Sequence, residues 1–361
     1  MLLQKIGAAV ISTVMTITSM VCPSTAAKLE SIDSVTKVRD NFYIMDYTYD
    51  YNINDIAKNG YLCTADMIVQ VAGDFILGKP VQNFGCSTFN AVTPEGEHIF
   101  GRNFDYMDAP SMLVRTNPKD GYASIAMLNL DLIGYKYFTP DTPVTKIISA
   151  LAPYAIVDGI NETGLSIGVL EIEKDPTFQL SPRKNITTSS MVRIVLDKAS
   201  TVEEAVRLFG NYDMRDLLTD GCTYHYHIAD ANGDSAVIEY VNNRMVVVYP
   251  EENEENAVDY QCATNFLLTP GAYDPNGLGQ DRYEVMMNKL NETKGVLSEE
   301  EAADLLQDVS VQDEDMNGYI CSTLWSCVYN NETKSVKLYL YNNFEDELVF
   351  DVFSSLKSQK Q

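Results

Sequence analysis

Cys86 is the residue whose neighbours in this sequence suggest chemistry most directly. It follows Gly85, and Arg102 and Asp105 stand 16 and 19 positions after it. If the chain is cut before Cys86, that residue gains an α-amine with an ordinary pKa of about 7.7–8.0, beside a thiol of about 8.5. An amine of matched pKa can take the thiol proton, so this nucleophile needs no histidine. Gly85 is small and flexible enough to let the peptide bend towards the thiol.

A hairpin is expected to bring the two charged residues to the thiol. Residues 86–104 read as strand, turn and strand, with the turn at 93–97. Folding back places Arg102 and Asp105 near Cys86, where the arginine favours a thiolate and the carboxylate holds the freed amine. A lone cysteine in an apolar run is more often a buried hydrophobe, and the Arg–Asp pair favours a nucleophile over that alternative.

The composition is that of an acidic, folded protein. The chain has 361 residues, 45% of them hydrophobic and 10% aromatic, and its net charge is −25. This hydrophobic content is typical of globular proteins, and the length fits one large domain or two smaller ones. The negative charge argues against binding to nucleic acid or to an anionic membrane surface.

The sequence pattern divides the chain into three parts. Residues 1–27 read as a signal peptide, with a lysine before an apolar stretch at 6–20 and small residues at the end. We therefore expect a secreted or extracytoplasmic protein. Residues 28–85 are a pro-segment or a retained small subunit, and 86–361 form the catalytic domain.

The remaining cysteines and the histidines predict neither a metal site nor a cofactor site. Six cysteines remain after Cys22, too few for a disulfide-built scaffold, and their spacing does not assign any pairing. His225 and His227 alternate on a predicted strand and so face one side. Without a third ligand, they are expected to be packed rather than metal-bound. Trp325 reads as a core strand residue.

The order of predicted elements indicates the fold class. Strands, a helix pair, strands, a second helix pair and strands follow Cys86, and two antiparallel sheets covered by helices are the simplest packing for that order, an α+β fold. Residues 64–77 read as an amphipathic helix and 251–255 as a solvated acidic loop. Strands are expected at 86–92, 98–104, 111–116, 122–128, 154–158, 164–172, 223–229, 236–240, 245–249, 262–265, 322–329 and 335–341, and helices at 188–198, 201–209, 280–291 and 298–307.

Several motifs in the chain resemble a known family. With Cys86, the stretches 101–105, 159–165, 263–265 and 281–283 follow the order seen in the linear-amide C–N hydrolases of the N-terminal-nucleophile (Ntn) superfamily. The resemblance covers roughly residues 86–345, and it implies an αββα sandwich. The group includes choloylglycine (bile salt) hydrolases, penicillin V acylases, acid ceramidase and N-acylethanolamine acid amidase.

The resemblance also implies a set of catalytic side chains. The cysteine is the nucleophile, its freed amine is the general base, the first arginine stands by the thiol and the aspartate holds the amine. The two asparagines bind the substrate amide and the oxyanion, and the second arginine supports the site. Taken singly, the last three residues also fit structural roles, as a turn asparagine, a strand end and a surface arginine. The set is Cys86, Arg102, Asp105, Asn161, Asn265 and Arg282.

The implied activity is that of an autoprocessing cysteine amidase without a cofactor. Cys86 first cleaves the Gly85–Cys86 bond and then hydrolyses linear N-acyl amides, either fatty-acyl amides or bile salt conjugates, through an acyl-enzyme. In the family, acid ceramidase and N-acylethanolamine acid amidase keep a leading segment as a small subunit, whereas the bile salt and penicillin enzymes have little chain there. The length of 28–85 therefore favours fatty-acyl amides. Three questions stay open: whether residues 28–85 are retained after cleavage, whether penicillin V is a substrate, and whether the protein forms a homo-oligomer.

Three alternative interpretations also stay open. An acyltransferase of the same superfamily would use Cys86 in the same way but pass the acyl group to an amine. A cysteine protease of papain type needs a distant histidine, and none of the three histidines stands in a recognisable motif. A secreted, non-catalytic binding protein would leave Cys86 unreactive towards acyl probes.

Overall fold

The structure is a computed structural model. The predicted signal peptide at 1–27, the predicted helix at 64–77 and the predicted acidic loop at 251–255 lie outside the described residues and stay predictions. Within the described residues, no helix is both long enough and apolar enough to cross a membrane. Those residues are 30–48, 50–51, 53–60, 85–133, 135, 139–172, 179–216, 223–250, 259–272, 277–316 and 319–354.

The larger sheet is antiparallel except where its second and third strands meet. That pair, β2 and β5, is parallel, and the other paired strands of the sheet run antiparallel. The segment that precedes Cys86 thus supplies one edge of this sheet. In the described part of the chain the strand order is β1 (Thr36–Arg39), β2 (Phe42–Tyr47), β5 (Ser111–Thr116), β6 (Ser124–Asn129), β7 (Asp158–Asn161), β8 (Ser166–Glu171), β11 (Tyr224–Ala229), β12 (Ser235–Val241) and β13 (Arg244–Val248).

The smaller sheet is antiparallel and carries Cys86 near one edge. β15 (Glu314–Met316) extends it by pairing with the start of β16. A separate parallel pair joins β9 (Lys184–Ile186) to β10 (Tyr212–Met214). The described strands of the smaller sheet follow the order β14 (Cys262–Ala263), β3 (Gly85–Val92), β4 (His98–Tyr106), β16 (Tyr319–Asn330), β17 (Ser335–Leu340) and β18 (Asn343–Asp351).

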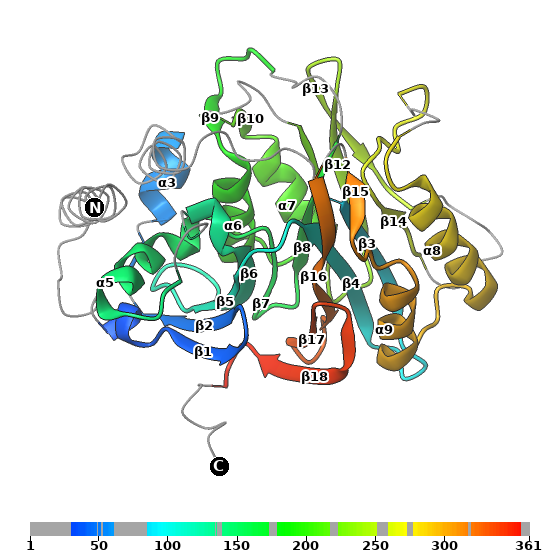
Figure 1. Cartoon of the computed structure of the whole chain (residues 1–361). Helices are drawn as coiled ribbons and strands as arrows, with labels where there is room; N and C mark the ends of the chain where they lie inside the picture. The colour runs from blue at the N-terminus through cyan, green and yellow to red at the C-terminus, as the bar shows by residue number, and fades with distance from the viewer. Residues whose placement is uncertain are drawn as a thin grey trace.

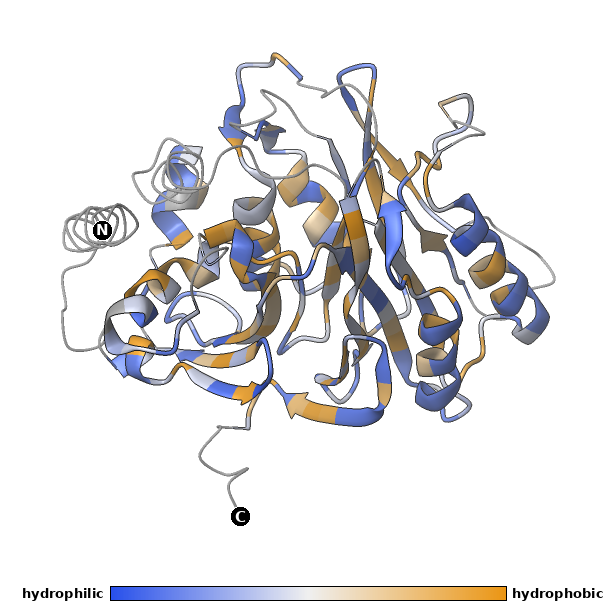
Figure 2. Ribbon diagram, in the orientation of Figure 1, coloured by the Kyte–Doolittle hydropathy of each residue, from blue (hydrophilic) through white to orange (hydrophobic). Residues whose placement is uncertain are grey.

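Helices cover the outer faces of both sheets and complete the predicted αββα sandwich (Figure 1). One apolar core lies between the sheets, a second between the larger sheet and α6, α7 and η3, and a third between the smaller sheet and α8 and α9. Figure 2 shows α8 and α9 as largely hydrophilic with a few apolar bands, as expected for helices with one buried face. The described helices are η2 (Leu130–Ile133), α3 (Ile53–Asn59), α5 (Pro143–Lys146), η3 (Ile147–Tyr154), α6 (Thr188–Lys198), α7 (Val202–Phe209), α8 (Gln280–Thr293) and α9 (Glu299–Asp308).

The turn between β3 and β4 is fixed by local hydrogen bonds. The Thr93 hydroxyl accepts a hydrogen bond from the Glu97 amide (3.1 Å), and the two backbones are also joined by a Thr93 N–Glu97 O bond of 2.7 Å. Gly96 has a φ of +90°, a conformation that glycine adopts without strain. The predicted turn at 93–97 is therefore confirmed, and it starts the register of the hairpin.

That register determines which side chains share a face with Cys86. It runs back from the turn to place Cys86 opposite Phe104 and Gly85 opposite Asp105. Because side chains alternate along a strand, Phe104 and Arg102 lie on the inner face with Cys86, whereas Asp105 lies on the outer face. A slip of one residue would exchange the two faces, so the hairpin is what positions the arginine and the carboxylate.

The segment that precedes Cys86 is built into the core. β2 pairs with β5 over its whole length, with Phe42 packed between the sheets and Tyr43 packed on the helix side. Further along, the Tyr51 hydroxyl lies 2.8 and 2.9 Å from the two carboxylate oxygens of Asp197 on α6. The same carboxylate forms an ion pair with Arg193. Residues 30–60 thus share both cores of the larger sheet.

Most predicted elements agree with the structure, and the exceptions have local causes. The strand predicted at 154–158 is wrong over most of its length, since η3 reaches Tyr154 and β7 begins only at Asp158. Pro153 lacks the N–H that a strand ladder uses, which is compatible with η3. The strand predicted at 262–265 ends at Ala263. The sequence pattern predicts none of β1, β2, β9, β10, β15, β18, α3, α5, η2 and η3.

Replacing Phe42 by alanine should destabilise the fold as a core substitution does, although the residue precedes Cys86. Phe42 is fully buried, so we expect Phe42→Ala to lower the free energy of unfolding by about 3–5 kcal/mol. Lys37→Ala on the exposed β1 serves as the control and should change it by no more than about 0.5 kcal/mol. Urea unfolding of both variants measures the difference, and equal effects would contradict a core role for β2.

Candidate active site

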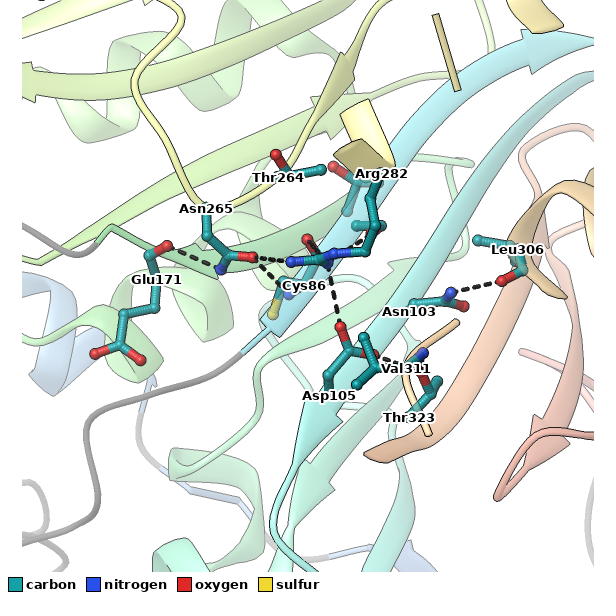
Figure 3. A network of polar contacts seen from close by, with 12 residues as sticks. Cys86, Asn103, Asp105, Glu171, Thr264, Asn265, Arg282, Leu306, Val311 and Thr323 are labelled. Atoms are coloured by element: carbon teal, nitrogen blue, oxygen red, sulfur yellow. Dashed lines mark hydrogen bonds and ion pairs between the residues drawn. The ribbon is translucent and has the colours of Figure 1, made fainter. Parts of the chain in front are cut away.

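The backbone N–H of Cys86 is held by a side chain because the neighbouring strand stops short. β14 pairs with β3 with Ala263 opposite Thr88, and the same register continued by two residues would set Asn265 opposite Cys86. The strand ends at Ala263, and instead the Asn265 Oδ1 accepts the hydrogen bond of Cys86 N at 2.8 Å (Figure 3). The main-chain donor of the cysteine is therefore satisfied without a ladder partner on that side.

The orientation of the Asn265 amide follows from its partners. Its Oδ1 also accepts a hydrogen bond from Arg282 Nη2 (2.9 Å), and its Nδ2 donates to the carbonyl of Glu171 (2.9 Å). Two donors face the oxygen and a carbonyl faces the nitrogen, so the reversed amide would lose all three bonds. Asn265 is thereby fixed between the end of β8 and Cys86.

Arg282, near the start of α8, binds the other main-chain group of Cys86. Its Nη1 donates to the Cys86 carbonyl (2.8 Å), to Ser87 Oγ (2.9 Å) and to Asp105 Oδ2 (3.2 Å). A Cβ at Gly279 would lie 2.6 Å from Arg282 Nη2, and Gly279 has a φ of +82°, so this approach requires glycine. The guanidinium lies between the Asn265 amide and the Asp105 carboxylate in Figure 3.

Asp105 lies against the residue that precedes the cysteine. Its Oδ1 accepts a hydrogen bond from the Thr323 hydroxyl (2.6 Å), and its Oδ2 lies 2.6 Å from the place that a Cβ of Gly85 would occupy. Burial raises the pKa of Asp105, while Arg282 and the Thr323 hydrogen bond oppose that rise. A buried carboxylate with an arginine partner is thus in contact with the Gly85–Cys86 peptide.

A second buried pair stands on the thiol side of Cys86, between the sheets. Arg102 donates from Nε to Asp158 on β7 (3.4 Å), and Asp158 also accepts hydrogen bonds from Trp325 Nε1 (3.0 Å) and the Tyr329 hydroxyl (2.5 Å). The Nη groups of Arg102 have no oxygen or nitrogen partner among the described residues. Their positive charge lies close enough to the thiol to lower its pKa.

The electrostatics of the intact chain favour a protonated thiol. Burial raises the pKa of the Cys86 thiol to about 11, because the lowering by Arg102 is smaller than the effect of burial and Asp105 raises it further. Near neutral pH the residue is therefore a thiol rather than a thiolate. A base has to take its proton before it can act as a strong nucleophile.

The structure brings five of the six predicted catalytic residues together and leaves Asn161 outside. Asn161 Nδ2 donates to the carbonyls of Leu196 (2.9 Å) and Ala199 (2.8 Å), and its Oδ1 accepts from the amides of Thr163 (3.0 Å) and Leu165 (3.1 Å). These bonds fasten the turn after β7 to the end of α6. In this structure the Asn161 amide is engaged in the turn, and its catalytic role stays a prediction. The five that converge are Cys86, Arg102, Asp105, Asn265 and Arg282.

Other residues of the cluster were not predicted. Asp158 stands directly before the motif at 159–165. The motif therefore identifies the correct strand, but Asp158 is the residue of that strand that contacts Arg102. Ser87 follows the cysteine and binds Arg282. Thr323 and the Glu171 carbonyl have no sequence signal, because only strand pairing brings them near Cys86.

The two histidines of β11 lie between the sheets, on one face of the strand as predicted. His227 Nδ1 lies 2.9 Å from Thr88 Oγ1 and its ring packs on Phe100, and burial lowers the pKa of His227 to about 3. His225 lies between Glu239 and the Thr264 carbonyl. Among the described residues, no cluster of three or more His, Cys, Asp or Glu side chains is arranged to hold a metal ion.

Comparisons with known proteins point to one family. The family model described as linear amide C–N hydrolases, choloylglycine hydrolase family, matches residues 86–269, about half of the chain. A penicillin V acylase from Pectobacterium atrosepticum is 30% identical over 117 residues, 30% of this chain and 29% of the relative, so the match spans under a third of that protein.

Two solved structures share the fold. A conjugated bile acid hydrolase mutant from Clostridium perfringens matches with a TM-score of 0.51 and 17% identity, over 74% of this chain and 92% of the other. Penicillin V acylase from Agrobacterium tumefaciens matches with a TM-score of 0.51 and 19% identity, over 73% and 85%. At these identities the likeness shows the sandwich fold alone.

Asn161→Ala tests the structural role that the contacts of this residue indicate. Its removal leaves two buried carbonyls and two amides without a partner, so we expect the free energy of unfolding to fall by at least about 2 kcal/mol. Asn211→Ala, at an exposed position after α7, should change it by no more than about 0.5 kcal/mol. Urea unfolding compares them, and an undiminished stability of Asn161→Ala would contradict the turn role.

Proposed function

We infer that this chain, which belongs to the choloylglycine hydrolase family of linear amide C–N hydrolases, uses Cys86 as its nucleophile after cutting its own Gly85–Cys86 bond. The observation that carries the proposal is the convergence of side chains on the backbone of Cys86. Asn265 holds its N–H, Arg282 holds its carbonyl, and Arg102 faces its thiol. A residue whose backbone nitrogen is bound this way is prepared to become an N-terminal amine.

The first reaction is the maturation of the chain. The Cys86 sulfur attacks the Gly85 carbonyl carbon, a C–S bond forms, the C–N bond breaks, and the thiol proton ends on the departing nitrogen. Water then hydrolyses the thioester, which leaves a carboxylate on Gly85 and a free thiol and amine on Cys86. Asn265 Oδ1 already binds the nitrogen that leaves, so no rearrangement of that partner is needed.

The new amine then serves as the base in turnover. It stays within reach of Asn265 Oδ1, and the loss of Gly85 opens space beside Asp105 Oδ2, which can accept a hydrogen bond from it. The amine takes the thiol proton, the thiolate attacks the substrate carbonyl, and the same proton goes to the leaving amine. Arg102 stabilises the thiolate, and we assign oxyanion binding to the hydrogen of Asn265 Nδ2 that does not bind the Glu171 carbonyl.

The proposed substrates are linear N-acyl amides, among them fatty-acyl amides and bile salt conjugates. Similarity to a penicillin V acylase and the shared fold of a conjugated bile acid hydrolase support this class without choosing within it. A panel of N-acylethanolamines, glycine and taurine bile conjugates and penicillin V, assayed with and without an added amine acceptor, separates hydrolysis from acyl transfer and ranks the acyl groups.

Cys86→Ala should abolish both cleavage of the chain and amide hydrolysis, because both reactions use the same sulfur. Cys262→Ala is the matched control, since Cys262 is also buried on the smaller sheet and its thiol contacts the Tyr283 carbonyl instead of the site. Gel electrophoresis and N-terminal sequencing follow the cleavage, and the substrate panel follows hydrolysis. Active wild-type protein with an intact Gly85–Cys86 bond would overturn the mechanism.

We also propose that the leading segment stays bound after cleavage and that residues 1–27 direct export. The pairing of β2 with β5 and the contact of Tyr51 with Asp197 support retention, because neither depends on the Gly85–Cys86 bond. Retention agrees with the longer leading segments that the family resemblance associates with fatty-acyl amidases.

The cleaved protein should therefore elute as one complex of two fragments. Size-exclusion chromatography followed by mass spectrometry is expected to find the fragment ending at Gly85 with the fragment starting at Cys86, in equal amounts. The two fragments should separate only when the larger fragment unfolds. Separation breaks the pairing of β2 with β5 and exposes the apolar side chains that β2 buries in the core. Elution of the large fragment alone, folded and active, would contradict retention.

A further inference from the structure

His225 and Glu239 form a fully buried pair on the sheet opposite Cys86. They lie on the adjacent strands β11 and β12 of the larger sheet, and both are 0% exposed. The ring Nδ1 of His225 lies 3.1 Å from Glu239 Oε1. Neither residue belongs to the predicted catalytic set. Their other hydrogen bonds cross the sandwich to a single segment, residues 264–269, which follows β14.

The partners of His225 indicate where its hydrogens lie. Its Nε2 lies 2.6 Å from the Thr264 carbonyl, which can only accept, so Nε2 carries a hydrogen. Its Nδ1 faces an oxygen of Glu239, and two lone pairs there would repel each other. One proton therefore lies between Nδ1 and Oε1 and joins the two side chains by a hydrogen bond.

Glu239 uses both carboxylate oxygens on the same segment. Oε1 accepts the hydrogen bond of Leu268 N (2.7 Å), and Oε2 accepts those of Thr269 N (2.9 Å) and Thr269 Oγ1 (2.5 Å). Although burial opposes it, these bonds and His225 hold the pKa of Glu239 below its ordinary value. A buried carboxyl group is tolerated only when its hydrogen-bonding capacity is filled, and here the segment and His225 fill it.

The held segment is the one that carries Asn265. His225 fixes the residue before it and Glu239 fixes the residues three and four positions after it. β14 has already ended at Ala263, so strand pairing with β3 no longer guides the chain at this point. Asn265 Oδ1 must nevertheless stay within hydrogen-bonding distance of Cys86 N, at 2.8 Å.

We propose that His225 and Glu239 are positioning residues, a buried pair that fixes the 264–269 segment and thereby sets the Asn265 amide against the nitrogen of Cys86. The pair acts through Asn265 and touches neither the sulfur nor the scissile peptide. Its importance for the reaction rests on the proposed function, since Asn265 matters only if Cys86 N becomes the leaving group and then the base.

The position of Asn265 can be measured without any catalysis. In the uncleaved Cys86→Ala chain, the backbone amide at position 86 is expected to keep its hydrogen bond to Asn265 Oδ1, so its hydrogen exchange reports that contact. We expect Glu239→Gln, which keeps the size of the side chain, to accelerate exchange at position 86 by at least about tenfold, the effect of losing one hydrogen bond. In a chain that also carries Asn265→Ala, Glu239→Gln should not accelerate exchange at position 86 any further.

Cleavage of the Gly85–Cys86 bond gives the second readout. In the otherwise wild-type full chain, Glu239→Gln and His225→Ala should each slow cleavage by about 10²-fold, the typical loss for a misplaced catalytic group. His227→Asn is the matched control, because His227 lies on the same strand and face but binds Thr88 instead of the 264–269 segment. It should change neither the exchange at position 86 nor the cleavage rate by more than about threefold.

The outcomes separate this inference from the proposed function. If a folded Glu239→Gln chain shows unchanged hydrogen exchange at position 86, the positioning role is overturned. It is also overturned if Glu239→Gln accelerates this exchange equally in the chain with Asn265 and in the Asn265→Ala chain. If His225→Ala fails to fold, Glu239→Gln still decides the question. Wild-type chain that never cleaves overturns the proposed function alone, since the exchange measurement does not depend on cleavage.

Discussion

The backbone nitrogen of Cys86 is satisfied by a side chain, and the rest of the site depends on this constraint. A buried N–H without an acceptor destabilises a fold by as much as a lost hydrogen bond, so some group has to bind it. In a complete ladder that group would be the carbonyl of a neighbouring strand. Because β14 ends at Ala263, Asn265 Oδ1 takes its place, and the Cys86 nitrogen is bound by a side chain instead of by a strand on that side.

Charge balance explains why arginines and aspartates are buried on both sides of the cysteine. An isolated charge in a protein interior is costly, but a paired and hydrogen-bonded one is tolerated. Arg102 with Asp158 forms the pair on the thiol side, and Arg282 with Asp105 forms the pair on the backbone side. The first lowers the pKa of the thiol, whereas the second holds a carboxylate beside Gly85. The hairpin register assigns Arg102 and Asp105 to these separate faces.

The sequence was sufficient for the parts of the site that depend on nearby residues. The turn at 93–97 and the fold-back of the hairpin are enough to predict Arg102 and Asp105 beside Cys86. Asn265 and Arg282 lie 179 and 196 positions from the cysteine, so only the family resemblance could associate them with it. His225 and Glu239 gave no signal of their role, because a strand pattern shows which face they share and not which segment they meet.

What the sequence left unassigned follows from the same limits. Asn161 belongs to a motif that follows the family order, and its amide binds residues two and four positions on and the end of α6. The motif alone does not distinguish this turn role from a catalytic one. β2 has no alternation because both of its faces are buried, and its parallel partner β5 begins 69 positions further along, so neither period nor hairpin spacing could reveal it.

Gly85 shows how closely the intact chain approaches the arrangement that the proposed cleaved form needs. A Cβ on this residue would lie 2.6 Å from Asp105 Oδ2 and 2.8 Å from Met316 Cε. The methionine end is flexible and can move, but Arg282 and Thr323 hold the carboxylate in place. Glycine is therefore required here for contact with Asp105 rather than for an unusual backbone angle. In the proposed mechanism, the carboxylate that would receive the new amine already lies against Gly85, so cleavage would have to change only the charge and freedom of one nitrogen.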